Sequence, residues 1–298
     1  MSMSELSVVP PDAPLSVAPF KTQLLKWVGN KQRFAHEIGS LLPADMGTYF
    51  EPFLGSGAVL ATLAPERAIA SDALEPLIEI FQELRSDPAG LVDWYADRMN
   101  GIKTHDDVVA RYSEVKDSYN RHPNGADLLF LCRTCYGGVV RFRRADGFMS
   151  TPCGAHMPVS VKSFSSRASE WSRRVKGSRF VSSDFRQIMD SAQSGDVVYC
   201  DPPYTDTQAI LYGSQAFRLA DLVCEIELAK ARGVRVALSI DGSKKSGLKE
   251  ILFDFPDGLF ETEVAITTGR SMLRRFQRGG DTLEDEVVKD RLLLTYAV

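Results

Sequence analysis

The amino-acid sequence of 298 residues predicts an α/β protein with a parallel sheet, because short apolar runs alternate with stretches of helical periodicity. The clearest strand is the β-branched and aromatic run 197–200, which follows a Gly-Asp turn signal and ends where Pro202 and Pro203 prevent further sheet pairing. A second observation is an apolar strand that enters a Gly-x-Gly turn at Gly55 and Gly57 and continues into a helical pattern. Strand, glycine turn and helix form the nucleotide-binding unit of doubly wound folds.

Composition places the chain among ordinary globular proteins, with 44% hydrophobic and 25% charged residues. No stretch reaches the apolar length of a membrane span, and the N-terminus lacks the basic-then-apolar pattern of a signal peptide. The five cysteines are an odd number in a chain without an export signal. These features predict a cytoplasmic protein with no disulfide framework and no membrane partner.

Charge is distributed unevenly along the chain. Between Cys132 and Phe180 there are ten Lys or Arg residues and only two Asp or Glu, in a chain whose net charge is −4. A basic middle in an acidic frame is typical of a site for a polyanion such as DNA. The alternative is a solvated charged face.

The N-terminal region contains the first candidate ligand-binding residues. Residues 1–20 are rich in Pro and Ser without periodicity and predict a flexible tail. Trp27 and Lys31 then flank a Gly-Asn turn that precedes a helical pattern ended by Pro43. A Lys there can meet a carboxylate or phosphate and a Trp can cover an apolar ligand, unless the two are simply a core Trp and a surface Lys.

Acidic residues follow three of the predicted strands. Asp72 follows the run 68–71, where it can accept hydrogen bonds from ribose hydroxyls or cap the next helix. Asp184, with Phe185 beside it, follows a strand around Phe180. Asp201 follows the run 197–200, at the carboxyl end of a strand where open α/β sheets bind ligands. Later strands are predicted at 234–240 and 291–296, with a helix from Leu219 between the strand 197–200 and the first of them; an exposed Asp at a plain strand exit is the alternative for Asp201.

The middle of the chain is predicted to be helical from 87 to 130 and then to form a β-hairpin over 133–148, where Gly-Gly and Asp-Gly punctuate alternating apolar and Arg residues. Arginines there can contact phosphates or guanine edges, and Tyr136 or Phe142 can insert into a base stack. The pairs Cys132/Cys135 and Cys153/His156 have the spacing of zinc ligands. Because Cys132 ends an apolar run typical of a buried helix, we favour the interpretation without a metal.

Three motifs in this order resemble those of the bacterial DNA adenine-N6 methyltransferases of the alpha group, the Asp-Pro-Pro-Tyr type whose familiar members methylate GATC. The motifs are Leu25-Lys26-Trp27-x-Gly-x-Lys31, Glu51-Pro52-Phe53-x-Gly55-x-Gly57 and Asp201-Pro202-Pro203-Tyr204. The resemblance covers about residues 22–297. It implies a Rossmann-like S-adenosylmethionine-dependent methyltransferase domain, residues 21–86 and 178–298, with an inserted helical and β-hairpin target-recognition domain, residues 87–177.

The resemblance also implies roles for individual residues. The catalytic residues that hold the target base are Asp201, Pro202, Pro203 and Tyr204. The residues expected to hold S-adenosylmethionine are Trp27, Lys31, Pro52, Phe53, Gly55, Gly57, Asp72, Asp184, Phe185 and Asp201. The resemblance implies that Arg133, Tyr136 and Arg141 contact DNA. Arg143 and Arg144, which have no match in the family motif, are expected to contact DNA from their place in the basic hairpin, as are Arg274 and Arg275 from a Gly-bounded basic stretch near the C-terminus. No metal is implied.

The expected reaction is methyl transfer from S-adenosylmethionine to N6 of an adenine flipped out of double-stranded DNA. A cognate restriction endonuclease would be a functional rather than a physical partner. Cys132 and Gly137 stand where the family has asparagines, so the resemblance does not extend to GATC specificity. Two alternatives are an N4-cytosine methyltransferase and a DNA-binding relative that has lost catalysis.

Overall fold

The computed structural model describes residues 15–143, 145–203, 217–241, 255–269 and 288–298. Their centre is a seven-stranded sheet of strand order β3-β2-β1-β4-β5-β7-β6. The strands are β1 Tyr49–Glu51, β2 Ala68–Asp72, β3 Ser178–Ser182, β4 Val197–Cys200, β5 Arg235–Asp241, β6 Thr262–Gly269 and β7 Val288–Leu294. Strands β3, β2, β1, β4 and β5 are parallel, and β7 is antiparallel to both β5 and β6. The predicted α/β fold with a parallel sheet is confirmed for the first five strands.

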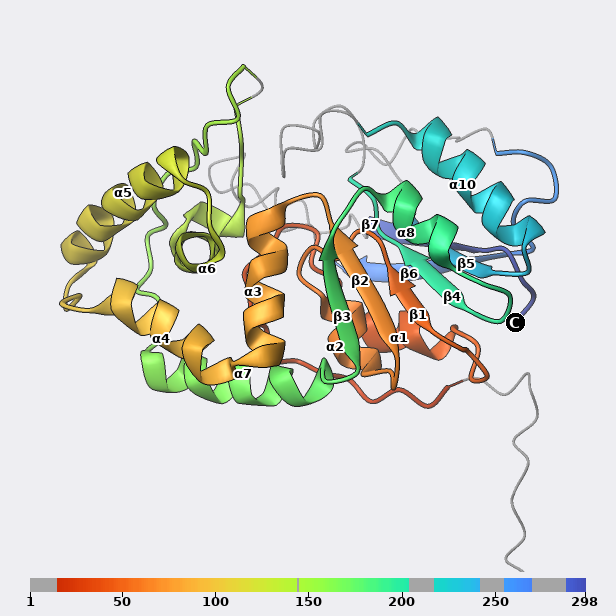
Figure 1. Ribbon diagram of the computed structural model, residues 1–298, viewed down its shortest axis with the longest axis horizontal. Helices are drawn as coiled ribbons and strands as arrows, with labels where there is room; N and C mark the ends of the chain where they lie inside the picture. Colours follow the sequence, from red (N-terminus) through yellow and green to blue (C-terminus); the bar gives the residue numbers. More distant parts are fainter. Residues whose placement is uncertain (1–14, 144, 204–216, 242–254, 270–287) are drawn as a thin grey trace, which may run out of the picture.

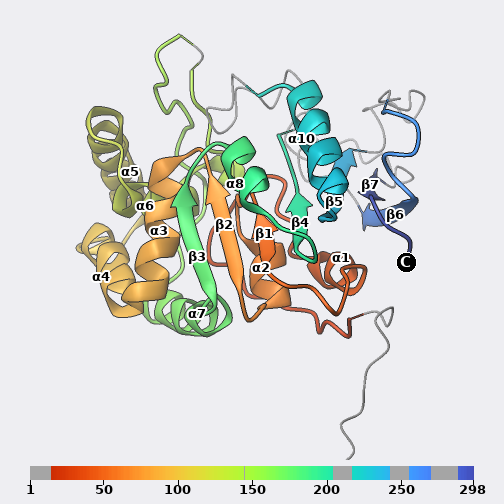
Figure 2. The ribbon, with the colours of Figure 1, turned by 45° about the vertical axis from the view of Figure 1, so that its right-hand side comes forward.

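Helices cover both faces of the sheet (Figures 1 and 2). They are α1 Ala35–Ser40, α2 Ala58–Leu63, α3 Glu75–Ser86, α4 Pro88–Met99, α5 His105–Arg121, α6 Gly125–Thr134, α7 Val161–Arg174, α8 Phe185–Ser191 and α10 Leu219–Ala231. Successive strand residues point to opposite faces. Tyr49 and Tyr199 therefore join the core shared with α1, α2 and α3, whereas Phe50 and Val198 join the core under α8 and α10. None of the described helices is long and apolar enough to cross a membrane.

The helices between β2 and β3 gather at one end of the molecule. Helix α4 packs against α6 and α7, and α5 packs against α6, while α3 contacts both this group and strands β2 and β3. Figure 1 shows α4, α5 and α6 beside α3, at the end opposite α10. Side chains cap the N-termini of four of these helices: Asp87, Thr104, Asn124 and Ser160. Each accepts a backbone N–H that would otherwise lack a partner.

A short hairpin forms in the basic segment, but it begins later than predicted. Arg133 continues helix α6, and Gly137, with φ of 64°, belongs to a 3-10 turn over Tyr136–Gly138. Two antiparallel bridges join the sides of the hairpin, Cys135 to Cys153 and Phe142 to Met149. The helix extends through Arg133 because that residue is buried with the apolar side of α6, which the alternation pattern did not reveal.

The prediction of a flexible tail through residue 20 is wrong at its end. Val17 packs against Gly39 of α1, and Phe20 is only 3% exposed. The Phe20 ring lies 5.6 Å from the ring of Trp171 and under the guanidinium of Arg174. Residues 1–14 lie outside the described residues.

Candidate functional site

The polar residues predicted from strand ends do lie along one edge of the sheet. Strand order runs outward from β1 to β2 and β3 on one side and from β4 to β5 on the other. The carboxyl ends of β1 and β4 therefore meet where the direction of the strand order reverses, and parallel sheets bind ligands at that point. Glu51 ends β1, and Asp201 directly follows β4.

An ion pair connects the N-terminal motif to this point. Lys31 Nζ lies 2.9 Å from Asp201 Oδ1, and their side chains are 7% and 19% exposed. Lys31 Nζ also donates to the carbonyl of Gly29 at 3.4 Å. Lys31 is therefore not a surface lysine, because its buried ammonium pairs with the carboxylate of Asp201.

Glu51 is a buried acid that was not predicted as a site residue, although it belongs to the glycine-loop motif. It is 2% exposed, and the Tyr49 hydroxyl donates to its Oε2 at 2.7 Å. Burial raises the pKa of Glu51 to about 8; the hydrogen bond from Tyr49 opposes this rise, and the nearby charge of Asp201 adds to it. At neutral pH Glu51 therefore holds its proton in most molecules. The sequence signal that could have identified Glu51 is its position between Phe50 and Pro52, at the end of a predicted strand.

The glycine turn lies under the indole of Trp27. Gly55 and Gly57 have φ of 48° and 65°, a conformation that favours glycine. A Cβ on Gly55 would stand 3.2 Å from Trp27 Nε1, and one on Gly57 would stand 3.1 Å from the ring of Phe81. Trp27 and the turn are thus brought together, as the two motifs predicted, although Trp27 itself is only 9% exposed.

Asp72, at the end of the neighbouring strand β2, hydrogen-bonds to the same glycine turn. Its Oδ2 accepts from Gly55 N at 3.0 Å and its Oδ1 from Leu74 N at 3.0 Å. Burial raises the pKa of the Asp72 carboxyl, while its backbone hydrogen bonds oppose the rise. The residue at the N-cap of α3 is Leu74, so Asp72 makes an Asx-type turn just before the helix rather than capping it. A carboxylate oxygen has more than one acceptor site, which leaves capacity for a ligand hydroxyl.

Three aromatic rings form an apolar wall beside the glycine turn. The Phe53 ring lies 5.2 Å from that of Phe185 and 5.6 Å from that of Phe217. The first two were predicted as cofactor contacts. Phe217 was missed, because a single Phe outside any periodic stretch carries no signal in the sequence. Such rings suit contact with a flat heterocycle.

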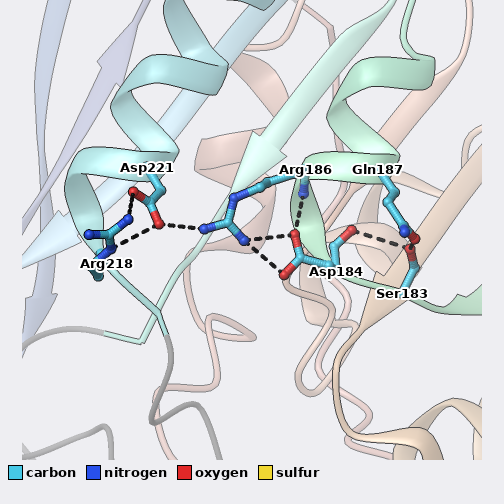
Figure 3. A network of polar contacts seen from close by, with 6 residues as sticks. All are labelled: Ser183, Asp184, Arg186, Gln187, Arg218 and Asp221. Carbon is cyan, nitrogen blue, oxygen red and sulfur yellow. Dashed lines mark hydrogen bonds and ion pairs between the residues drawn. The ribbon is translucent and has the colours of Figure 1, made fainter.

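Asp184 belongs to a surface network that links the starts of α8 and α10 (Figure 3). It caps α8 by accepting from Arg186 N at 2.9 Å, and its carboxylate lies 3.0 Å from the Arg186 guanidinium. Arg186 also pairs with Asp221 of α10, which in turn pairs with Arg218 at 2.7 Å. Asp184 therefore lies at the carboxyl end of β3, as predicted, and its orientation depends on Arg186.

The predicted DNA contacts occupy different environments. Arg133 is 4% exposed and donates to the carbonyl of Leu24, so we correct its assignment from DNA contact to structural residue. Tyr136 and Arg141 are exposed. Arg143 is exposed and pairs with Asp146 at 2.6 Å. Their loop projects from α6 toward the side to which the arrows of β2, β3 and β4 point (Figures 1 and 2).

The predicted prolines lie at the same sheet edge, and the Pro52 carbonyl accepts from the Ser71 hydroxyl at 3.3 Å. Pro52 and Pro202 are buried and Pro203 is half-buried at the same sheet edge. The predicted residues outside the described ranges are Tyr204, Arg144, Arg274 and Arg275.

All five cysteines lie in the described part of the chain. None forms a disulfide, and Cys132 and Cys135 are buried. Among the described residues no group of three or more His, Cys, Asp or Glu side chains is arranged to hold a metal ion.

Comparison with known proteins agrees with this arrangement. The family described as D12 class N6 adenine-specific DNA methyltransferase matches residues 27–255. A type II methyltransferase of Lactococcus lactis subsp. cremoris is 27% identical over 256 residues, which cover 82% of this chain and 88% of that protein. A DNA adenine methylase of Haemophilus influenzae is 28% identical, covering 70% and 73% of the two chains. A DNA N-6-adenine-methyltransferase of Escherichia phage P1 is 27% identical over 80% of this chain and 32% of its own length. The chain belongs to the D12 class of N6 adenine-specific DNA methyltransferases, a family of S-adenosylmethionine-dependent enzymes.

Proposed function

We propose that this protein methylates N6 of an adenine flipped out of double-stranded DNA, with Asp201 as the residue that holds the reacting amine. The observation that carries the proposal is the position of Asp201 at the reversal of the strand order, with Lys31 paired to it and the glycine turn on the neighbouring strand. Asp201, Lys31 and the glycine turn thus come together from three segments that are far apart in the sequence.

The residues present fit S-adenosylmethionine. At Gly55 a Cβ would fill the space against Trp27, as expected where backbone approaches a ligand closely. Asp72 offers acceptor capacity for ribose hydroxyls, and Phe53 and Phe185 offer an apolar surface for the adenine ring. When bound, S-adenosylmethionine supplies an electrophilic methyl group.

The chain's own groups then activate the amine. The lone pair of the exocyclic nitrogen is delocalised into the adenine ring, which makes it a poor nucleophile. The Asp201 carboxylate and the Pro202 carbonyl accept the two N–H hydrogens and thereby favour tetrahedral nitrogen. The two prolines hold these acceptors rigidly, and fixed acceptors contribute mainly by positioning. We assign stacking on the base to Tyr204, as the motif predicts.

We call the carboxyl ends of β1 to β4, with Glu51, Asp72, Asp184 and Asp201, the catalytic edge. We assign sequence recognition to the inserted region 87–177, because its loop includes exposed Tyr136 and Arg141 and projects toward the side to which the strand arrows point (Figure 2). An enzyme with this activity works where the DNA is, so we place it in the cytoplasm of a bacterial or phage-infected cell. A restriction endonuclease of matching specificity remains a prediction.

The test is methyl transfer from labelled S-adenosylmethionine to plasmid from a methylation-free host, followed by nucleoside analysis and methylation-sensitive sequencing. We expect N6-methyladenine at one short sequence, and a loss of at least about a thousandfold in Asp201→Ala with cofactor affinity only partly weakened. N4-methylcytosine as the product, or a rate for Asp201→Ala within about tenfold of the wild-type rate, would overturn the proposal.

A further inference from the structure

The segment that leads into Trp27 is held by side chains of the inserted region. Three consecutive backbone carbonyls each accept a hydrogen bond from helix α6 or α7. The pairs are Trp171 Nε1 to Thr22 O at 2.8 Å, Arg167 to Gln23 O at 3.0 Å, and Arg133 to Leu24 O. Residues 20–26, which we call the strap, thus gain partners for their carbonyls from helices that lie more than 100 residues later in the chain.

Arg133 is buried where it contacts the strap. It is 4% exposed, and burial lowers its pKa. Its Nη1 donates to the Leu24 carbonyl, and its guanidinium lies 5.7 Å from the centre of the Phe164 ring, whereas its buried Nε has no hydrogen-bond partner among the described residues. An arginine in this position acts on the strap and not on DNA.

The turn that begins the recognition loop also touches the strap. Gly138 has φ of 69°, and a Cβ built on it would stand 2.9 Å from Lys26 Cβ and 3.1 Å from the Lys26 backbone carbonyl carbon. Lys26 is followed by Trp27, whose indole lies over Gly55. Lys26 and Trp27 therefore connect the recognition turn, with exposed Tyr136, to the glycine turn of the catalytic edge.

We propose that the inserted region positions the cofactor site: through the strap, Arg133, Arg167 and Gly138 fix the placement of Trp27 and Lys31. Arg133 and Arg167 are positioning residues, since neither lies at the catalytic edge. The proposal rests on the proposed function, because it takes S-adenosylmethionine as the ligand of that edge.

The first test compares two arginines of α7. Arg167 is half-buried and bonded to the strap, whereas Arg173 is exposed on the same helix. Binding of S-adenosylmethionine to the full chain is measured by calorimetry without DNA. We expect Arg167→Gln to raise the dissociation constant at least about threefold and Arg173→Gln to leave it unchanged.

The second test compares two glycines with positive φ. Gly138→Ala forces a Cβ against the strap, whereas Gly147→Ala meets nothing within 4 Å although its φ is 67°. Both substitutions carry similar backbone strain. We expect only Gly138→Ala to weaken cofactor binding.

The third test separates the strap from DNA contact at Arg133. Arg133→Lys keeps a charged donor and should weaken cofactor binding less than Arg133→Met. Neither should change the salt dependence of DNA binding, which a lost phosphate contact would reduce by about one unit of slope.

The outcomes are distinct. If Arg167→Gln and Gly138→Ala bind S-adenosylmethionine as wild type does, the positioning role is wrong, even where their melting temperatures fall. A wild-type chain that binds no S-adenosylmethionine would overturn the proposed function as well.

Discussion

The catalytic edge and the basic segment differ in how well the sequence predicts the surroundings of a side chain. At the edge, each candidate acid follows a strand, and the strand fixes both its end of the sheet and its face. Asp72, Asp184 and Asp201 accordingly lie at the carboxyl ends of the parallel strands β2, β3 and β4. In the basic segment, similar arginines have unlike surroundings: Arg133 is buried, while Arg141 is exposed. Strand periodicity therefore places a side chain far better than local charge does.

After the loss already expected for Asp201→Ala, the largest effect we expect within the edge concerns Lys31. Lys31→Ala removes the partner 2.9 Å from Asp201 in a mostly buried pair. Loss of a charged hydrogen bond costs about 1.5–3 kcal/mol, or roughly 10- to 150-fold. We measure cofactor affinity by calorimetry and the methylation rate under single-turnover conditions. The product of the two fold-losses should equal this factor.

Lys176→Ala is the matched control for Lys31, because Lys176 is exposed and lies outside the strap, before the N-terminal end of β3. Equal effects of the two substitutions would mean that the Lys31 pair has no special role at the edge.

Arg141 tests the other region. An arginine at a base edge discriminates by about 1–3 kcal/mol, so Arg141→Ala should relax the recognised sequence at one position. The measurement is methylation of matched and single-mismatch duplexes. A uniform decrease on all duplexes would instead assign Arg141 to phosphate.

Arg143 provides the contrast within the same loop. It already pairs with Asp146 and lies 4.2 Å from the centre of the Phe148 ring. An arginine held by these two neighbours is not expected to read a base edge, so we assign it to phosphate. Arg143→Ala should weaken binding to all duplexes by the same factor and reduce the salt slope of binding by about one unit. Altered sequence preference in this variant would contradict the division between the two arginines.

The smallest expected effect is on stability at the edge. The pKa of Glu51 is raised to about 8 by burial, so the folded chain keeps a proton that the unfolded chain releases above about pH 4.3. Stability from this group is fully present below the unfolded pKa and is lost as pH rises through 8.

Glu51→Gln removes this titration while leaving an acceptor for Tyr49. The melting temperature of Glu51→Gln minus that of wild type should therefore rise by a few degrees as the pH is raised from about 5 to about 9. Glu66→Gln, at an exposed position, serves as the control. A difference between Glu51→Gln and wild type that does not change with pH would contradict the raised pKa of Glu51.

The sequence was sufficient for the elements with strong local signals and insufficient where distant contacts decide. Helix α8 was not predicted because its seven residues are too few to show a 3.6-residue period. Strand β6 was missed because its partner β7 follows a long Gly- and Arg-containing stretch, without the short turn that marks a hairpin. Phe217, the strap and the burial of Arg133 depend on contacts across more than 30 residues, which local pattern does not encode.

The most direct test measures the chemical step and discrimination separately in Asp201→Ala and Arg141→Ala. Single-turnover methylation and equilibrium binding are recorded on the matched duplex and on one with a single mismatch. We expect Asp201→Ala to lose methylation while still binding the matched duplex preferentially. We expect Arg141→Ala to retain methylation while losing that preference at one base pair. If both variants lose the same property to the same extent, catalysis and recognition are not divided between the sheet edge and the inserted loop.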